Sequence, residues 1–172
     1  TKFRPTAVCR MSTSPAAALL DPAALVTGMR RWAQALGFSR LGIARIDLAD
    51  DEAHFLDWLR AGFNGEMSYM SRHGCKRSRP AELLPGTVSC VGVRMDYWPQ
   101  RAADAQATLA DPAVAYVSRY ALSRDYHKLI RSRLQKLCDR IEHAVGPFGY
   151  RVFTDSAPVL ERSWAVKSGL GW

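Results

Sequence analysis

Apolar residues recur at helical spacing in three parts of the chain. The first part begins at Asp21, a side chain that can cap a helix, continues with Pro22 in the opening turn, and ends at Gly37. The second part covers residues 50–62 and ends on Gly62. The third covers residues 125–146, where an apolar stripe faces away from many basic residues; the stripe consists of Leu129, Ile130, Leu134, Leu137, Cys138 and Ile141. These patterns predict three capped amphipathic helices, the last one long and lying on the surface.

Three other segments have the pattern of β-strands. Residues 38–46 alternate between apolar and polar side chains, and residues 88–97 form an apolar run that predicts a buried strand ending before Trp98 and Pro99. Residues 149–155 predict a short third strand that places Asp155 at its end. An Ala- and Asp-rich stretch around Pro112 is predicted to be a linker. Helices and strands together predict a single mixed α/β domain.

Length and composition agree with one domain. The chain has 172 residues, of which 48% are hydrophobic, enough to bury a core. Residues 1–20 are predicted to be a disordered or extended segment, within which Met11 offers an alternative start, and residues 21–172 to form the domain. No apolar run is long enough for a membrane span, and the residues before Met11 lack the features of a signal peptide, so we expect a cytoplasmic protein with no membrane partner.

The cysteines and the charge suggest different kinds of chemistry. The four cysteines stand singly, without a C-x-x-C pair, so no metal site is predicted on this chain and reduced thiols are expected. The net charge is +8, with basic residues gathered at residues 72–79 and 119–140. Such clusters favour a phosphate-rich partner such as nucleic acid, although solvated basic faces are also common.

The position of Asp155 has two interpretations. A carboxylate that follows a strand and precedes a helix with Pro158 in its first turn lies where α/β sheets often place ligands and catalytic groups. The same carboxylate can instead be an ordinary helix N-cap. Its position alone favours the cap, and the two roles are compatible.

Several stretches together resemble the N-terminal domain of the epoxyqueuosine reductase family, cobalamin-dependent enzymes of the last step of queuosine formation in tRNA. The D-x-x-P-x-x-E-R pattern that begins at Asp155, at this distance from R-D-Y-H at residues 124–127, is the specific part of the resemblance. The other matching stretches are GFSRLGIARI, GEMSYM, RSRPAELLPG, VGVRMDYWP, SRYA and the closing ERSWAVKSGLGW.

The resemblance implies roles for individual residues. Asp155 matches the catalytic acid that protonates the epoxide oxygen, and burial against the cofactor would have to raise its pKa. The cobalamin site would include Tyr126, His127, Ser156 and Arg162. Arg162 follows Asp155 by seven residues, about two helical turns, so the same helix face can bring both to one pocket. His127 would be a surface histidine of the helix without the resemblance.

The resemblance also implies a larger assembly. The family joins an α/β domain similar to nitroreductase-like cobalamin-processing proteins to a ferredoxin-like domain with two 4Fe-4S clusters, which this chain lacks. The ending on residues 155–172, rich in glycine and tryptophan, then corresponds to an interior sequence, and we expect a truncated form that is inactive alone. The expected partners of the monomer are the tRNA anticodon stem-loop and an external electron donor. Phosphate contacts are expected from Lys128, Arg131 and Lys136 on the basic helix.

Two alternatives remain open from the sequence. Reductive dehalogenases share the cobalamin and iron-sulfur plan, but small organohalides give no reason for a net charge of +8. A cobalamin carrier or an RNA-binding module without catalysis is the alternative outside the enzymes.

Overall fold

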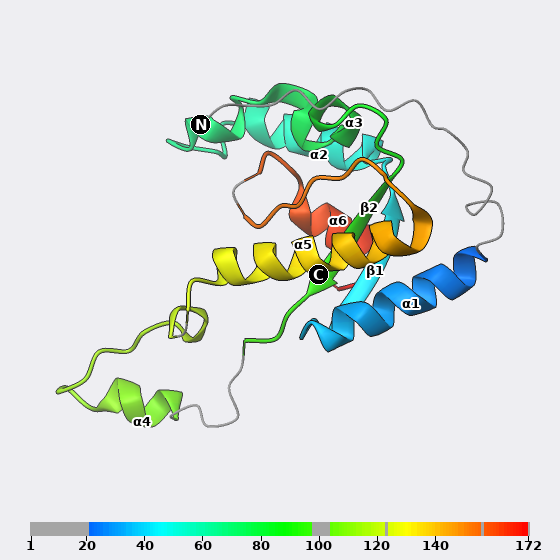
Figure 1. The fold of residues 1–172 in the computed structure, drawn as a ribbon. Coiled ribbons are helices and arrows are strands. Elements are labelled where there is room, and N and C mark those ends of the chain that lie inside the picture. The colour runs from blue at the N-terminus through cyan, green and yellow to red at the C-terminus, as the bar shows by residue number, and fades with distance from the viewer. Residues whose placement is uncertain (1–20, 98–103, 123, 156, 172) are drawn as a thin grey trace, which may run out of the picture.

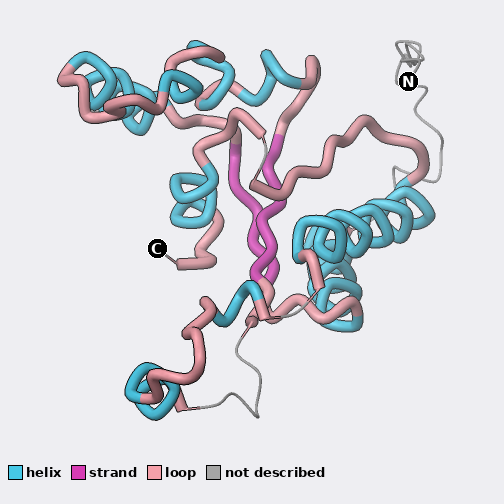
Figure 2. The backbone as a smooth tube through the Cα atoms, turned by 90° about the vertical axis from the view of Figure 1, so that its left-hand side faces the viewer, coloured by secondary structure: helices cyan, strands magenta, loops and turns pink. Residues whose placement is uncertain are grey.

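A two-stranded antiparallel sheet with helices on both faces forms the centre of the molecule (Figures 1 and 2). The computed structural model describes residues 21–97, 104–122, 124–155 and 157–171. The α-helices are α1 (Pro22–Ala35), α2 (Ala49–Arg60), α3 (Pro80–Leu83), α4 (Ala105–Ala110), α5 (Tyr126–Val145) and α6 (Glu161–Lys167). The strands are β1 (Arg40–Arg45) and β2 (Ser89–Arg94), and the short 3-10 helices are η2 (Ser68–Met70), η3 (Gly74–Arg77) and η4 (Arg119–Ala121). The prediction of a mixed α/β fold is confirmed.

The main core lies between α1, α5 and one face of β1. Its buried residues are Met29, Ala33, Phe38, Leu41 and Leu137. Burial of each large side chain contributes about 1.5–3 kcal/mol, so this cluster is the main reason the two predicted helices dock against the sheet. Asp21 caps α1 as predicted, because its carboxylate accepts hydrogen bonds from the backbone N–H groups of Ala23 (3.0 Å) and Ala24 (3.2 Å).

The opposite face of the sheet carries α6. Strand residues alternate between faces, so Leu41 points to α1 while Gly42 and Ala44 point to α6. Ala44 and Trp164 belong to a second buried cluster with Leu48. Gly42 lies so close to the end of α6 that a β-carbon there would stand 2.0 Å from the carbonyl oxygen of Ser168. The sheet therefore separates α1 and α5 from α6 (Figure 2).

The prediction that residues 88–97 form a buried strand is right about the strand and wrong about its burial. Ser89–Arg94 pair with β1 in register, Leu41 opposite Val93 and Ile43 opposite Val91. Val88 is 78% exposed and Val91 is 38% exposed. Within the described residues the sheet has only two strands, so much of β2 stays uncovered. The predicted strand end at Trp98 and Pro99 lies outside the described residues.

The predicted strand at residues 149–155 is wrong. This segment runs from α5 towards α6 without joining the sheet, because no strand of the described chain pairs with it. The following helix also starts later than predicted: α6 begins at Glu161, its N-cap position is Leu160, and Pro158 lies in the loop before it. Asp155 is therefore neither at a strand end nor a helix cap, and the interpretation of its carboxylate as an N-cap is also wrong.

Two smaller corrections concern the ends of local elements. The predicted linker contains α4, whose first N–H groups donate to Asp104, a true helix cap. The second predicted helix begins at Ala49 and not at Asp50, and the side chain of Asp47 accepts from the N–H of Ala49 (3.0 Å). That helix ends at Arg60, two residues before the predicted Gly62. Short-range side-chain acceptors decide where these helices start. None of the described helices is both long and apolar enough to cross a membrane.

A charged contact fastens α2 to the segment before α3. Arg79 donates two hydrogen bonds to the carboxylate of Glu52, at 2.6 and 3.0 Å, and the hydroxyl of Ser78 donates a third. The hydrogen bonds from Arg79, followed by the one from Ser78, lower the pKa of Glu52 from 4.5 to about 2. The ionised carboxylate is thus the form that holds the two segments together.

Acid is expected to weaken this contact. A carboxyl group with a lowered pKa in the folded state contributes stability above its unfolded pKa, and that contribution disappears as the pH falls from about 4.5 towards 2. The thermal midpoint of the Glu52→Gln variant should therefore fall less between pH 6 and pH 3 than that of the unaltered chain. Glu66→Gln, at an exposed position, is the matched control and should retain the full acid sensitivity. Equal acid sensitivity of both variants would contradict the assignment.

Candidate active site

The first turn of α5 presents two of the predicted site residues side by side. Asp125 precedes the helix and accepts a hydrogen bond from the backbone N–H of His127 (3.0 Å), which fixes the start of α5. The same carboxylate oxygen lies 3.0 Å from His127 Nδ1. The rings of Tyr126 and His127 stack with centroids 4.0 Å apart, and the ring of Tyr120 meets Tyr126 edge-on at 5.8 Å. These contacts fix the orientations of the Tyr126 and His127 side chains.

Asp155 lies in a loop, 28 residues after His127, and its side chain contacts the start of α5. Its Oδ2 atom accepts a short hydrogen bond from the Tyr126 hydroxyl and lies 3.3 Å from His127 Nε2. Its backbone has a φ of 55°, and among the described residues it is the one non-glycine residue with a positive φ. This left-handed conformation is uncommon for residues with side chains and is tolerated best by Asn and Asp. The side chain remains 49% exposed, and that of His127 45% exposed.

Two carboxylates, those of Asp125 and Asp155, lie on the two ring nitrogens of His127. A carboxylate can only accept hydrogen bonds, so the contact with Asp125 assigns a hydrogen to Nδ1 of the ring. Nε2 then faces Oδ2 of Asp155 at 3.3 Å, a distance at which an imidazole and a carboxyl group can exchange a proton. The arrangement thus brings an imidazole and a carboxyl group together at an exposed surface, a pair that general acid catalysis can use.

Neighbouring groups adjust the acidity of the cluster. The hydrogen bond to Asp155, with a smaller contribution from burial, raises the pKa of Tyr126 from 10 to about 12. The hydrogen bond from His127 lowers the pKa of Asp125. Loss of solvent and then the negative charge of Asp155 raise the pKa of Glu161, whose carboxylate accepts from the backbone N–H of Asp155 (3.3 Å). Tyr126 is therefore a weak acid here and acts as a hydrogen-bond donor to Asp155.

The structure brings together part of the predicted site. Asp155, Tyr126 and His127 are in direct contact, although the prediction gave no reason for that contact beyond the family resemblance. Arg162 is exposed on α6, and none of its atoms forms a hydrogen bond or ion pair within the described residues. Arg162 does not share a helix face with Asp155, contrary to the prediction, because Asp155 precedes the helix. Ser156 lies outside the described residues.

Two residues of the cluster were not predicted. Asp125 orients His127 through the ring and the backbone, and its position two residues before the histidine at the predicted helix start was the available signal. Glu161 contacts the loop of Asp155 through a backbone hydrogen bond, and no local sequence pattern indicates that contact. The role of Asp125 can be recognised in the sequence because capping is a local interaction, whereas the contact of Glu161 depends on how the loop folds.

The contact between Tyr126 and Asp155 can be tested by titration. We expect a Tyr126 pKa near 12 in the unaltered chain and a value closer to 10 in Asp155→Asn, because the hydrogen bond to a full negative charge is lost. The stabilisation from this bond is complete below pH 10 and disappears as the pH approaches 12. NMR of ¹³C-labelled tyrosine, with Tyr126→Phe to assign the signal, measures the pKa.

Asp125→Asn is the control for general electrostatic effects. Asp125 is also negatively charged near Tyr126, but its charge is the smallest of the contributions to the raised pKa. A decrease in the Tyr126 pKa as large in Asp125→Asn as in Asp155→Asn would contradict the hydrogen-bond assignment.

The basic face predicted on α5 is present on its exposed side. Lys128, Arg131 and Lys136 are all exposed, whereas Leu137 is buried against α1. Lys128 follows His127 directly, so the basic face begins at the candidate active site. Cys75, Cys90 and Cys138 are free thiols, and no group of three or more metal-ligating residues gathers in the part of the chain that the structure describes. The site is therefore an exposed acid cluster next to a row of positive charges.

Known proteins that resemble this chain share the part that carries the cluster. Residues 77–156, which include the whole cluster except Glu161, match the protein-family model described as "Epoxyqueuosine reductase QueG, DUF1730". The chain is 57% identical to the epoxyqueuosine reductase of Pseudomonas aeruginosa over 152 residues, 88% of this chain and 42% of that protein. It is 49% identical to that of Escherichia coli over 153 residues, 89% of this chain and 40% of the relative.

Solved structures show the same fold. The epoxyqueuosine reductase of Streptococcus thermophilus matches with a TM-score of 0.68 at 18% identity, over 86% of this chain and 39% of the other. A crystal structure of epoxyqueuosine reductase with an epoxyqueuosine-modified tRNA-Tyr stem-loop matches with a TM-score of 0.69 at 19% identity, over 88% and 40%. The predicted resemblance is thus confirmed: the chain is similar to epoxyqueuosine reductases and spans about two fifths of the length of the curated relatives it matches.

Proposed function

We propose that this chain is the cobalamin-binding part of an epoxyqueuosine reductase, which reduces epoxyqueuosine to queuosine in the anticodon loop of tRNA. The proposal rests on the similarity to epoxyqueuosine reductases and on the contact of Asp155 with His127 and Tyr126. Reduction of an epoxide to an alkene consumes two electrons and two protons and releases the ring oxygen as water. Asp155 supplies the first proton, to the ring oxygen, in this proposal.

The residues around the cluster fit a large flat cofactor beside the acid. Tyr120 and Leu122, which lead into α5, are 53% and 60% exposed, and Tyr120 packs edge-on against Tyr126. An apolar surface of this kind next to Asp155 suits a corrin ring, and its coverage would strengthen the electrostatic interactions of the acid. Tyr126 and His127 would hold the cobalamin, with Ser156 and Arg162 as further candidates. When bound, cobalamin supplies low-potential electrons at cobalt.

Each residue of the cluster has a distinct task in the proposal. Asp125 orients the His127 ring, and His127 returns a proton to Asp155 after each transfer. The Tyr126 hydroxyl fixes the direction of the Asp155 carboxyl group, while Glu161 holds the loop through the backbone N–H of Asp155. The left-handed backbone at Asp155 presents the carboxyl group to the helix start. Asp155 is the catalytic residue in this scheme, and Asp125 and Glu161 are positioning residues.

The basic face of α5 is the proposed contact for the tRNA backbone. Phosphate contacts release counterions, so each one that is lost reduces the slope of log affinity against log salt by about 0.9 for a duplex. Replacing Lys128, Arg131 and Lys136 together with alanine should therefore weaken binding to every tRNA and reduce the slope by about two to three units. Fluorescence anisotropy with a labelled anticodon stem-loop at several salt concentrations measures both quantities.

A second triple variant separates this face from the net charge. Arg31, Arg45 and Arg60 are also exposed and lie on α1, β1 and α2, outside both basic clusters, so their replacement removes the same charge from elsewhere. This control should change the slope by less than half as much. If the slope of log affinity against log salt is the same in the α5 variant and in the unaltered chain, the basic face of α5 makes no phosphate contacts.

The rest of the proposal concerns the complete protein. Residues 21–172 would form the cobalamin-binding domain, similar to nitroreductase-like cobalamin-processing proteins, and a further domain would hold two 4Fe-4S clusters. Electrons would come from an external donor protein, and the enzyme would act as a cytoplasmic monomer. The relatives are more than twice as long as this chain, which leaves room for such a domain.

Cobalamin binding by the chain tests the proposal directly. We expect the absorption bands of cob(II)alamin to shift when the purified chain is added, with saturation at one equivalent. His127→Ala combined with Tyr126→Phe should weaken the shift, whereas Lys128→Ala, one position further along α5, should leave it unchanged. An unchanged spectrum at high protein concentration would refute residues 21–172 as a cobalamin-binding domain.

A further inference from the structure

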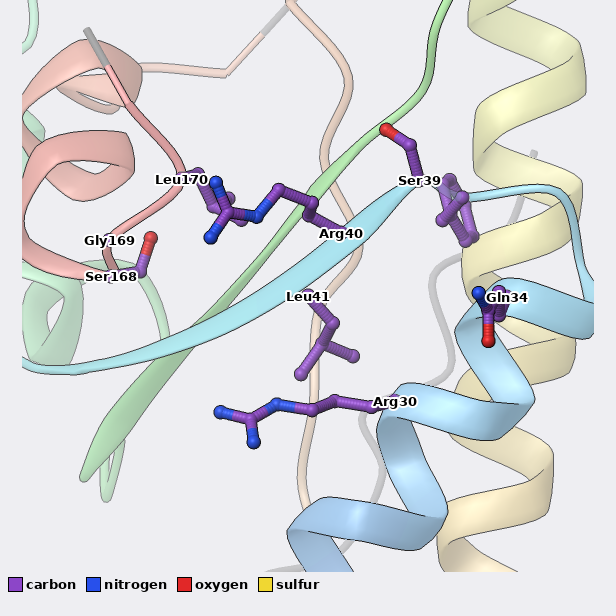
Figure 3. A pocket seen from close by; sticks show the side chains of 9 residues that line it. Arg30, Gln34, Ser39, Arg40, Leu41, Ser168, Gly169 and Leu170 are labelled. Carbon is purple, nitrogen blue, oxygen red and sulfur yellow. The ribbon is translucent and has the colours of Figure 1, made fainter.

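We propose that a second phosphate-binding site lies at the outer edge of β1, between α1 and the end of α6. This inference rests on the proposed function, because the phosphate groups it assigns to the site are those of an RNA strand. A pocket of about 400 Å³ opens there, and its lining includes Arg30, Gln34, Arg40 and Ser168 (Figure 3). None of the residues that line the pocket belongs to the cluster around Asp155.

The fold explains how two arginines come to share this pocket. Arg30 belongs to α1, on one face of the sheet, and Arg40 is the first residue of β1. Residues of β1 at even positions face α6, so Arg40 points towards the end of that helix while Arg30 approaches from the other face. Figure 3 shows Arg40 on the side of β1 that carries Ser168 and Leu170, and Arg30 on the other side with Leu41, the two side chains extending in the same direction along the strand. The two charges thus border one opening.

The positive charge of the pocket is only partly neutralised. Arg40 is paired across the sheet with Arg94, which places two like charges opposite each other. Arg94 has an acidic partner, Asp96, at 3.5 Å. Within the described chain neither Arg30 nor Arg40 has an ion pair, and no carboxylate lines the pocket. Uncompensated arginines at one opening attract an anion, and their planar donor groups match the geometry of phosphate oxygens.

Two other polar side chains, Ser39 and Gln34, line the pocket, and they differ in whether they can bind a ligand. The Ser39 hydroxyl is already engaged with the carbonyl of Arg94 (3.1 Å) and with Asp96 (3.0 Å), so it is not available as a donor. The side-chain amide of Gln34 has no hydrogen-bond partner among the described residues and can donate to an anion at the rim. A volume of about 400 Å³ is within the range of small-ligand sites, roughly 300–1,000 Å³, and exceeds what one phosphate needs. A nucleotide of an RNA strand, bound through its phosphodiester, fits both the volume and the positive charge of the pocket.

A pair of charge-matched double variants tests the site. Arg30→Ala with Arg40→Ala removes the pocket charges, and Arg31→Ala with Arg45→Ala removes two exposed arginines from the same helix and strand. We expect the pocket variant to bind a labelled anticodon stem-loop about tenfold more weakly than the unaltered chain, and its slope of log affinity against log salt to be smaller by about two. The affinity of the control variant should fall by less than threefold. Thermal midpoints of both variants establish that they are folded.

The outcomes distinguish this site from the proposed function. Equal losses in the two double variants, or no loss in either, would overturn the site while leaving the role of α5 in RNA binding intact. A mononucleotide that competes with the stem-loop at equal concentration would overturn the assignment to RNA, because it would identify a free nucleotide as the ligand. Failure of the unaltered chain to bind the stem-loop would overturn both the site and the tRNA part of the proposed function. Cobalamin binding, measured on the same variants, should be unaffected.

Discussion

Replacing Asp155 with asparagine is expected to reduce turnover of epoxyqueuosine in tRNA by a factor of about 10²–10⁴, the range typical for loss of a general acid. The amide keeps the size of the side chain and still accepts the hydrogen bond from Tyr126, but it has no proton to transfer. Because the chain spans about two fifths of its relatives, the measurement uses a chimera in which it replaces the matching segment of the Pseudomonas aeruginosa enzyme. Single-turnover rates are followed by mass spectrometry of the tRNA nucleosides.

The fold of this variant should be almost unchanged. Asparagine tolerates the left-handed backbone found at Asp155, so the substitution adds little strain. Asp104→Asn is a matched control, since Asp104 is a true helix cap and asparagine caps helices about as well. The control should keep both its rate and its thermal midpoint. A stable and fully active Asp155→Asn chimera would show that the acid lies elsewhere, with Tyr126 as the next candidate.

Replacing Gly42 with alanine is expected to lower the free energy of unfolding by about 1–3 kcal/mol, the usual cost of overpacking. The added β-carbon would stand 2.0 Å from the carbonyl oxygen of Ser168. That atom belongs to the backbone at the end of α6, so the clash cannot be relieved by rotating a side chain. Strand and helix must separate, which also loosens the packing of Trp164 against Ala44.

Replacing Gly28 with alanine is expected to have the opposite effect on the free energy of unfolding. Gly28 lies inside α1, and an added β-carbon would meet the ring of Trp32 at 3.6 Å, an ordinary contact. Alanine favours a helix over glycine by about 0.5–1 kcal/mol, so this variant should be more stable. Urea unfolding followed by circular dichroism measures both variants. A Gly42→Ala variant as stable as the unaltered chain would contradict the close docking of α6 on β1.

Local patterns in the sequence predicted the helices well. The cap at Asp21 and the apolar stripe of residues 125–146 depend on contacts within three or four positions, so they can be read without knowing the fold. The first two predicted strands, in β1 and β2, were also found, because alternation of side chains is a local property. The family resemblance likewise followed from the sequence, since it depends on residue identity and spacing alone.

Long-range contacts decided what the patterns could not. Residues 149–155 have the composition of a strand, yet a strand needs a partner, and none of the described chain pairs with them. The exposure of Val88 and Val91 similarly follows from the small size of the sheet. Sequence patterns express a preference for a conformation, whereas pairing and burial depend on which other segments come near.

The candidate site shows the same division. The sequence alone determined that His127 stands at the start of a basic helix beside Asp125 and Tyr126, because capping and helix periodicity are local. Only the tertiary structure decided that Asp155 meets Tyr126 and His127, and that Arg30 and Arg40 border one pocket. These contacts join segments that are distant along the chain. They form because the burial of apolar side chains between α1, α5 and the sheet fixes where the connecting segments run.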